Sequence, residues 1–298
     1  MSATIADTFA EAFPMTAARA IVTADTPGWA EIAGREMSGY ATSVIACDAE
    51  AGIERILAPE ETPDGRPGVS VLVFAFSRDG LEKALSNRVG QCVMTCATTA
   101  CYNGLPLGEK TVKVGGRLRY FGDGWQISKK LDGRRYWRVP VMDGEFLCEE
   151  TFGTIKGVAG GNLILSAVDA RSALEAAEAA VAAMRAVRDV ILPFPGGVVR
   201  SGSKVGSKYR ALRASSNTAF TPTLRGVLAS EIPPGANCSY EIVIDGLTLD
   251  AVERATAAGI HAIKDRPGVV AIGAGNYGGK LGPYHIRLRD VLETYPCP

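Results

Sequence analysis

The segment Tyr240–Asp245, which reads YEIVID, carries the residue types best suited to acid–base chemistry in this chain. Alternation along a strand places Glu241 and Asp245 on one face and the two isoleucines on the other. Burial in an apolar strand raises the pKa of a carboxyl group, and a raised pKa suits a general acid at neutral pH. The alternative is a structural glutamate paired with an arginine at a sheet edge.

A second candidate is the loop Ser201–Tyr209, which reads SGSKVGSKY. Glycine lets the backbone approach a ligand closely. Lys204, Ser207 and Lys208 add positive charge and a hydroxyl, which suit an anionic or carbonyl-rich ligand. A solvated turn would have a similar composition, and that interpretation stays open.

The remaining glycine clusters do not indicate a nucleotide site. No glycine is followed by the spacing and the Gly-Lys-Ser/Thr ending of a phosphate-binding P-loop. Gly273–Gly278 fits the letters GxGxxG, but it follows the closing strand of its half of the chain instead of opening a helix. Nucleotide binding is therefore not expected.

The cysteines and histidines do not predict a metal site or a thiol nucleophile. Cys92, Cys96 and Cys101 lack the paired spacing of a zinc site, and the only two histidines, His261 and His285, are distant in sequence. No histidine base lies near these thiols in sequence. We expect no metal, and we interpret Cys92 and Cys96 as small core residues of a strand.

Composition narrows the class of protein. The 298 residues suffice for two domains, and 47% of them are hydrophobic. Lys plus Arg and Asp plus Glu both number 32, so neither nucleic acid nor a membrane surface is an expected partner. No apolar run reaches about 18 residues, the length of a membrane span. An acidic N-terminal segment without a signal pattern and an odd cysteine count, seven, predict a cytoplasmic protein with reduced thiols.

The order of elements predicts an α+β fold of two ferredoxin-like (split β-α-β) lobes packed together. Each half shows the order β-α-β-β-α-β. In the first half we expect strands at 18–24, 42–47, 69–76 and 91–96 and helices at 29–37 and 78–88. In the second half we expect strands at 162–168, 190–192, 240–244 and 268–272 and helices at 170–188 and 248–263.

Two further regions complete the expected organisation. Strand-like segments at 113–121 and 135–141 predict a hairpin-rich insertion after the first unit, and the long connection 193–237 is expected to hold extra strands. The predicted domains are 1–148, an N-terminal ferredoxin-like lobe with the hairpin insertion, and 149–298, a C-terminal ferredoxin-like lobe.

Several blocks, spread from Asp7 to Gly282, resemble formylmethanofuran:tetrahydromethanopterin formyltransferase. They read DTFAEAFPM, SVIACDAEAGIE, TPDGRPG, GQCVMTC, GVAGGN, PFPGGVV, SGSKVGSKY, YEIVIDG and AGNYGGKLG. The resemblance implies two ferredoxin-like lobes, a homo-oligomer with clefts near lobe and subunit contacts, and no tightly bound cofactor. It implies reversible formyl transfer between a methanofuran-type carrier and N5 of tetrahydromethanopterin, with both carriers as substrates.

The resemblance also implies site residues. The catalytic glutamate of the family's YEIVIDG-like motif corresponds to Glu241. Carrier-binding candidates come from the two glycine-flanked loops: Lys204, Ser207, Lys208, Asn276, Tyr277 and Lys280. The Ala-rich and Arg-rich composition resembles members from bacterial methylotrophs, which work with the subunits of a hydrolase complex in formaldehyde oxidation. In that setting the net direction is toward the furan carrier.

Two other functions remain as alternatives. One is a catalytically weak scaffold subunit of such a formyltransferase/hydrolase complex. The retained motif blocks argue against it. The other is an acyltransferase that binds CoA or a nucleotide, and the absence of a P-loop argues against that.

Overall fold

The computed structural model describes residues 2–297, and the chain forms two compact units. One unit spans Met15–Gly157, and the other combines the N-terminal residues up to Pro14 with the chain from Val158 onward. Helices and mixed sheet occur in both units, so the predicted α+β class with two domains is confirmed. The lobe limits 1–148 and 149–298 stay a prediction. No described helix is long and apolar enough to cross a bilayer.

The unit Met15–Gly157 contains the predicted β-α-β-β-α-β order. Its strands pair in the order β5-β2-β4-β3 with antiparallel neighbours, which is the ferredoxin-like arrangement. The elements are β2 (Phe9–Thr23), α1 (Pro27–Ser38), β3 (Glu50–Leu57), β4 (Gly68–Ala75), α2 (Arg78–Arg88) and β5 (Ala100–Asn103).

Local sequence explains where these two helices begin. The side chain of Thr26 accepts the Trp29 N–H at 3.4 Å ahead of Pro27, as the sequence predicts for α1. Ser77 caps α2 in the same way through the Gly80 N–H at 3.0 Å. Alanine and methionine side chains of α1, and alanine and leucine side chains of α2, are buried in one cluster with Val69 and Val71 of the sheet. The fold of this unit therefore follows from its capping and alternation signals.

Two predicted strands in this unit are wrong in position. Residues 42–47 form a turn in which the carboxylate of Glu50 accepts the Val44 N–H at 3.0 Å, and the strand β3 starts at Glu50. Residues 91–96 continue α2 through a π-helical turn, Val89–Val93, and β5 starts only at Ala100. Cys92 lies in this turn and Cys96 follows it, and both are half-buried instead of lying in a strand. Local hydrogen bonds override the β-branched character of both segments.

The insertion after β5 is a hairpin only in its second part. Residues 113–121, predicted as a strand, end β6 and then form the short helix α3 and a 3-10 turn. The antiparallel strands β7, β8 and β9 follow, and β9 pairs with β5 in parallel. The elements are β6 (Thr111–Lys113), α3 (Gly115–Leu118), β7 (Ile127–Leu131), β8 (Arg134–Val141), β9 (Gly144–Glu149) and β10 (Thr151–Gly153).

The second unit repeats the same topology. Its strands pair in the order β16-β11-β15-β12, again ferredoxin-like, and β1 adds to β16. The strand β17 pairs with the first residues of β2. The elements are β1 (Thr4–Ile5), β11 (Ile155–Ala167), α4 (Ala170–Arg185), β12 (Val190–Ile191), β13 (Lys204–Val205), β14 (Ala214–Ser215), β15 (Cys238–Gly246), α5 (Leu249–Ile263), β16 (Val269–Gly273), β17 (Tyr284–Arg287) and α6 (Leu288–Thr294).

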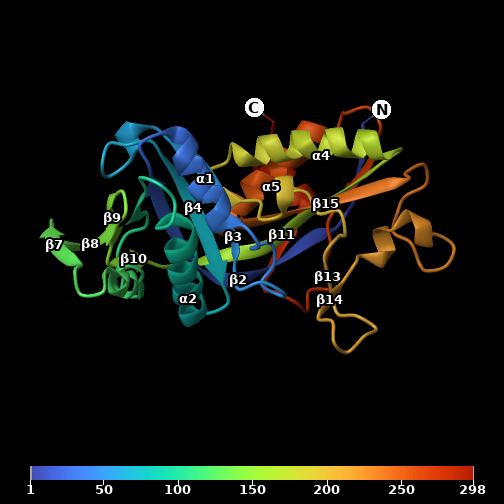
Figure 1. Ribbon diagram of the computed structural model, residues 1–298. Coiled ribbons are helices and arrows are strands. Elements are labelled where there is room, and N and C mark those ends of the chain that lie inside the picture. The colour runs from blue at the N-terminus through green and yellow to red at the C-terminus, as the bar shows by residue number, and fades with distance from the viewer. Residues whose placement is uncertain (1, 298) are drawn as a thin grey trace. The chain divides into compact units, whose positions relative to one another are not determined.

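The sheet of the second unit has two different faces. The helices α4 and α5 pack on one face, where residues such as Leu163, Ile242 and Ile244 are fully buried. In Figure 1, α4 and α5 lie on one side of β11 and β15, whereas β13 and β14 lie on the other. Cross-strand register places Asn162 opposite Val243 and Ile164 opposite Glu241, so these side chains share the face without helices. This face carries the candidate site.

Candidate active site

Glu241 is buried on the helix-free face of β15, with 3% of its surface exposed. Its backbone is paired on both sides, with Ile164 of β11 and with Val199. The Ser203 hydroxyl donates to Oε1 of Glu241 at 2.6 Å, and the Ser203 backbone N–H donates to Oε2. Among the described residues no lysine or arginine forms an ion pair with this carboxyl group. The alternative of a sheet-edge Glu–Arg pair is therefore wrong.

The environment of Glu241 destabilises the charged form of its carboxyl group. Burial raises the pKa of the Glu241 carboxyl group, and the two hydrogen bonds from Ser203 offset only part of that effect. A carboxyl group that keeps its proton closer to neutral pH can donate that proton or a hydrogen bond. A raised pKa is one property that a general acid at neutral pH requires.

Glu241 also lines a cavity of about 490 Å³ in the same unit. The lining residues include Arg200 and the aromatic residue Phe220. Residues with hydroxyl or amide groups complete the lining: Ser201, Asn217, Thr221, Thr223, Asn237 and Ser239. A cavity of this size lies within the range of small-molecule sites. The cavity can hold a polar, ring-containing ligand beside a proton donor.

A second buried carboxylate is that of Glu11, which is 2% exposed. It lies in the first part of β2, before Met15, and this part belongs to the same unit as Glu241. Its Oε2 atom accepts the N–H groups of Tyr277 at 2.7 Å and Gly279 at 3.1 Å. Its Oε1 atom accepts the N–H groups of Leu281 and, at 2.8 Å, Gly282. Burial alone would raise the pKa of Glu11, but these four bonds lower it below its ordinary value. Glu11 is thus held as an anion by backbone amides.

Tyr277 links the loop that binds Glu11 to the segment that binds Glu241. Its phenol oxygen accepts the Val205 N–H at 2.7 Å, two residues after Ser203. Burial raises the pKa of the Tyr277 phenol, and the charges of Glu241 and Glu11 raise it further, although the Val205 bond lowers it. The structure therefore brings Tyr277 and Glu241 into one electrostatic environment.

The other residues that the sequence predicts to bind the carriers differ in exposure and in hydrogen bonding. The Lys204 ammonium group is half-buried and donates to the Thr218 hydroxyl at 3.3 Å. The Ser207 hydroxyl accepts the Tyr209 N–H, and the Asn276 amide donates to the Phe9 carbonyl at 3.2 Å. Lys208 and Lys280 are exposed, and neither forms an ion pair with a described residue.

Sequence patterns missed Ser203, Glu11 and Arg200 as parts of this centre. Ser203 belongs to the loop that the sequence singles out, but its contact with Glu241 depends on the return of that loop to β15. Glu11 lies between Ala10 and Ala12 in a strand where both neighbours are fully buried. A carboxylate in such an apolar stretch is the signal that could have identified it, as it did for Glu241.

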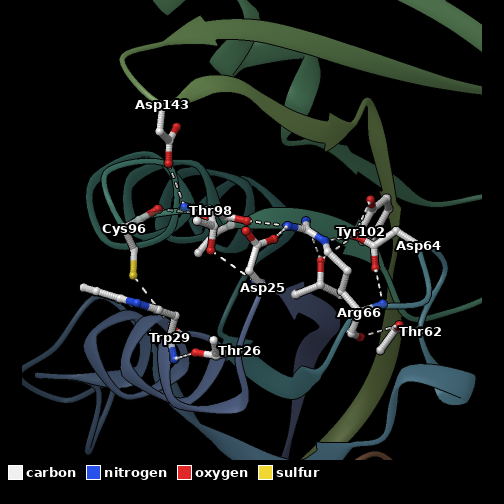
Figure 2. Close-up of polar contacts among 12 residues, drawn as sticks. Asp25, Thr26, Trp29, Thr62, Asp64, Arg66, Cys96, Thr98, Tyr102 and Asp143 are labelled. Atoms are coloured by element: carbon white, nitrogen blue, oxygen red, sulfur yellow. Dashed lines mark hydrogen bonds and ion pairs between the residues drawn. The ribbon is translucent and has the colours of Figure 1, made fainter.

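A polar cluster in the other unit has a different character (Figure 2). Arg66 donates to Asp64 at 2.9 Å, to Asp25 at 2.9 Å and to the Thr98 carbonyl at 2.5 Å, and the Tyr102 hydroxyl donates to Asp64 at 3.0 Å. Burial would raise the pKa of Asp64, but its bonds lower it overall. These groups satisfy one another, which is typical of a structural network.

No group of three or more histidine, cysteine, aspartate or glutamate side chains within residues 2–297 is arranged to hold a metal ion. Cys96, one of the thiols considered above, lies with its Sγ 3.8 Å from the Trp29 carbonyl oxygen (Figure 2). Burial raises the pKa of the Cys92 and Cys96 thiols, which keeps them in the poorly nucleophilic protonated form. The buried carboxyl groups are therefore better candidates for acid–base chemistry than these thiols.

Comparison with known proteins gives consistent matches over nearly the whole chain. Sequence profiles described as "Formylmethanofuran-tetrahydromethanopterin formyltransferase" and "FTR, proximal lobe" match residues 1–141 and 144–291. The formylmethanofuran--tetrahydromethanopterin formyltransferase of Methylobacillus flagellatus is 57% identical over 295 residues, which cover 97% of this chain and 98% of that protein.

Two solved structures are similar to the chain. One is the crystal structure of the formyltransferase/hydrolase complex of Methylorubrum extorquens with methylofuran, with a TM-score of 0.94 and 51% identity over 98% of this chain and 97% of that one. The other is the formylmethanofuran:tetrahydromethanopterin formyltransferase of Methanosarcina barkeri, with a TM-score of 0.92 and 49% identity over 97% of this chain and 98% of that one.

The fold and the site define an α+β enzyme with two ferredoxin-like units and a buried carboxyl group at the wall of a ligand-sized cavity. The comparisons make the class specific. The chain belongs to the formylmethanofuran–tetrahydromethanopterin formyltransferase family, which confirms the resemblance seen in its sequence blocks.

Proposed function

We propose that this chain transfers a formyl group between the amine nitrogen of a methanofuran-type carrier and N5 of tetrahydromethanopterin. The observation that carries the proposal is the position of Glu241. In a chain of the formyltransferase family, the buried carboxyl group of Glu241 has a raised pKa and lines a cavity of about 490 Å³. The two carriers are substrates, and the chain needs no tightly bound cofactor for this reaction.

The proposed reaction is direct transfer. The N5 lone pair attacks the formyl carbon, and the carbonyl oxygen gains negative charge in a tetrahedral intermediate. The protonated Glu241 donates a hydrogen bond or a proton to this intermediate. As the bond from carbon to the furan carrier's nitrogen breaks, that nitrogen gains a proton and N5 loses one. Glu241 can carry this proton because Ser203 holds its carboxyl group in place.

Orientation of the two carriers contributes a large part of the rate. Binding both reactants side by side removes the entropic cost of a bimolecular encounter, an advantage of up to about 7–11 kcal/mol in well-oriented systems. The groups we assign to carrier binding lie in the two loops around Glu241: Lys204, Ser207, Lys208, Asn276, Tyr277 and Lys280. The exposed lysines provide positive charge for anionic carrier groups.

Partners follow from the relatives. A protein of Methylorubrum extorquens that is 51% identical over 298 residues is named as one of the subunits of a formyltransferase/hydrolase complex. We propose that this chain forms homo-oligomers and joins hydrolase-complex subunits in the cytoplasm, with net transfer toward the furan carrier.

The test is a transfer assay with the purified chain, formyl-tetrahydromethanopterin and the furan carrier. We expect formyl-carrier formation that needs both substrates. Omission of either carrier is the control. Absence of transfer by a folded chain that still binds hydrolase-complex subunits would support the scaffold alternative instead.

A further inference from the structure

Two buried carboxylates of one unit are linked by a short chain of contacts. The segment Ser203–Val205 forms the first links of this chain, because Ser203 binds Glu241 and Val205 donates to the Tyr277 hydroxyl. The backbone N–H of Tyr277 in turn binds Glu11 at 2.7 Å. The position of the Tyr277 side chain relative to Glu241 therefore depends on the loop that Glu11 holds.

The loop after β16 is anchored at its start, where the Asn276 amide donates to Thr8 and Phe9, and its following residues depend on Glu11. Residues 277–281 form no regular helix or strand, and Gly278 and Gly279 have φ angles of +69° and +74°. Four N–H groups of residues 277–282 converge on the two oxygens of Glu11. Such convergent amides form an anion-binding concavity, and here the anion is a side chain of the same unit. Glu11 therefore fixes the backbone that carries Tyr277.

The Tyr277 hydroxyl is oriented with its proton available. Its oxygen uses a lone pair to accept the Val205 N–H, and the phenol proton has no acceptor among the described residues. The phenol is half-buried, and burial raises its pKa, with a further contribution from the negative charge of Glu241. A phenol held in this way can donate to an oxygen that develops negative charge.

We propose that Glu11 is a positioning residue for formyl transfer, because it fixes the 277–282 loop so that the Tyr277 hydroxyl is a second hydrogen-bond donor beside Glu241. This inference rests on the proposed function, and it adds a donor and its support to the single carboxyl group proposed there. In this scheme Tyr277 donates to the carbonyl oxygen, and Glu241 handles the proton that moves between the two nitrogens.

The experiment is a double-mutant cycle with Tyr277→Phe and Glu11→Gln. Removal of the phenol hydroxyl should lower kcat by about 10²-fold, the usual effect of losing one donor to a developing oxyanion, with little change in KM. Glu11→Gln should lower kcat by a similar factor alone, but by less than about 3-fold in the Tyr277→Phe background. Unchanged kcat in Tyr277→Phe, or equal effects of Glu11→Gln in both backgrounds, would overturn the proposal.

Matched controls separate this effect from general damage. Tyr284→Phe and Glu253→Gln make the same chemical changes elsewhere in the unit and should leave kcat unchanged. If Glu11→Gln does not fold, Glu11→Asp keeps the charge with a shorter reach and should lower kcat in the same non-additive way. Additive loss in Glu11→Asp would contradict the proposal.

A readout without turnover distinguishes failure of this inference from failure of the proposed function. Ultraviolet titration should give a lower phenol pKa for Tyr277 in Glu11→Gln and in Glu241→Gln than in the wild type, with Tyr277→Phe identifying the signal. If the wild type transfers no formyl group but this titration behaves as expected, the coupling stands and the assigned reaction is wrong. If transfer occurs but the titration is unaffected by Glu11→Gln, the positioning role is wrong.

Discussion

The hydroxyl of Ser203 lies 2.6 Å from Oε1 of Glu241, and the N–H of the same serine binds the other carboxyl oxygen. One residue therefore holds both oxygens of the buried acid. These bonds stabilise the charged form, whereas burial destabilises it and raises the pKa of Glu241 overall. The balance between the two effects sets the pH range in which Glu241 keeps its proton.

Ser203→Ala should shift this balance. Loss of the hydroxyl removes a bond that lowers the pKa of Glu241, so the pKa should rise further. If protonated Glu241 is the active form, activity falls as pH rises through that pKa, and the alkaline limb of the kcat profile should move to higher pH. The measurement is kcat against pH, with Ser128→Ala on the exposed strand β7 of the other unit as control. A limb that moves to lower pH, or does not move, would contradict the assignment.

Glu11→Gln should weaken folding in a pH-dependent way. The pKa of Glu11 in the folded protein is lowered from its ordinary value of 4.5, so its contribution to stability is present above that pH and is lost as pH falls through the folded pKa. We expect the variant to lose about 2 kcal/mol of unfolding free energy at pH 7, since the bonds to a charged acceptor are weakened. Urea unfolding of both proteins at several pH values should show this difference in unfolding free energy shrinking below pH 4.5. A difference that stays constant with pH would contradict the binding of a charged Glu11 by the loop amides.

Gly282→Ala should disrupt the same loop by a steric route. A Cβ atom at this position would lie 2.1 Å from the Ala12 carbonyl oxygen, which is backbone and cannot rotate away. Overpacking of this kind costs about 1–3 kcal/mol. In Gly278→Ala nothing lies within 4 Å of the added atom, so only the strain of a φ angle of +69° remains. Thermal unfolding should therefore rank Gly282→Ala below Gly278→Ala, and the reverse order would contradict the close approach.

Arg66→Gln should affect stability but not the acid–base chemistry. Arg66 binds Asp25, Asp64 and the Thr98 carbonyl in the other unit, so its loss leaves these groups partly unsatisfied (Figure 2). We expect a loss of about 2 kcal/mol in unfolding free energy. The kcat profile against pH should keep its wild-type midpoints. A shifted alkaline limb in Arg66→Gln would connect this network to the reaction and contradict a purely structural role.

The sequence predicts most of the fold because its signals are local and agree with one another. Thr26 with Pro27, and Asp169 with its bond to the Ser172 N–H at 2.8 Å, begin helices where capping rules place them. The second ferredoxin-like unit matches its predicted elements closely. The strand expected at 42–47 failed because Glu50, outside the segment, caps the turn through the Val44 N–H.

In the candidate site, too, local sequence patterns identify some residues, whereas contacts between distant segments are not predicted. Alternation in β15 identifies Glu241 as a carboxylate in an apolar strand, and burial bears this out. The contacts of Glu11 with residues 277–282 join positions about 270 residues apart, and no local pattern encodes such a contact. Glycine-flanked loops were recognisable in the sequence, but their hydrogen bonds to the two carboxylates depend on the tertiary fold.

The measurement that tests the central claim most directly is single-turnover formyl transfer by Glu241→Gln with both carriers bound. We predict that this variant folds and binds each carrier as the wild type does, but that its transfer rate falls by about 10²- to 10⁴-fold, as for loss of a general acid. Glu253→Gln is the matched control and should transfer at the wild-type rate. A wild-type rate in Glu241→Gln would show that the buried carboxyl group is not the acid of the reaction.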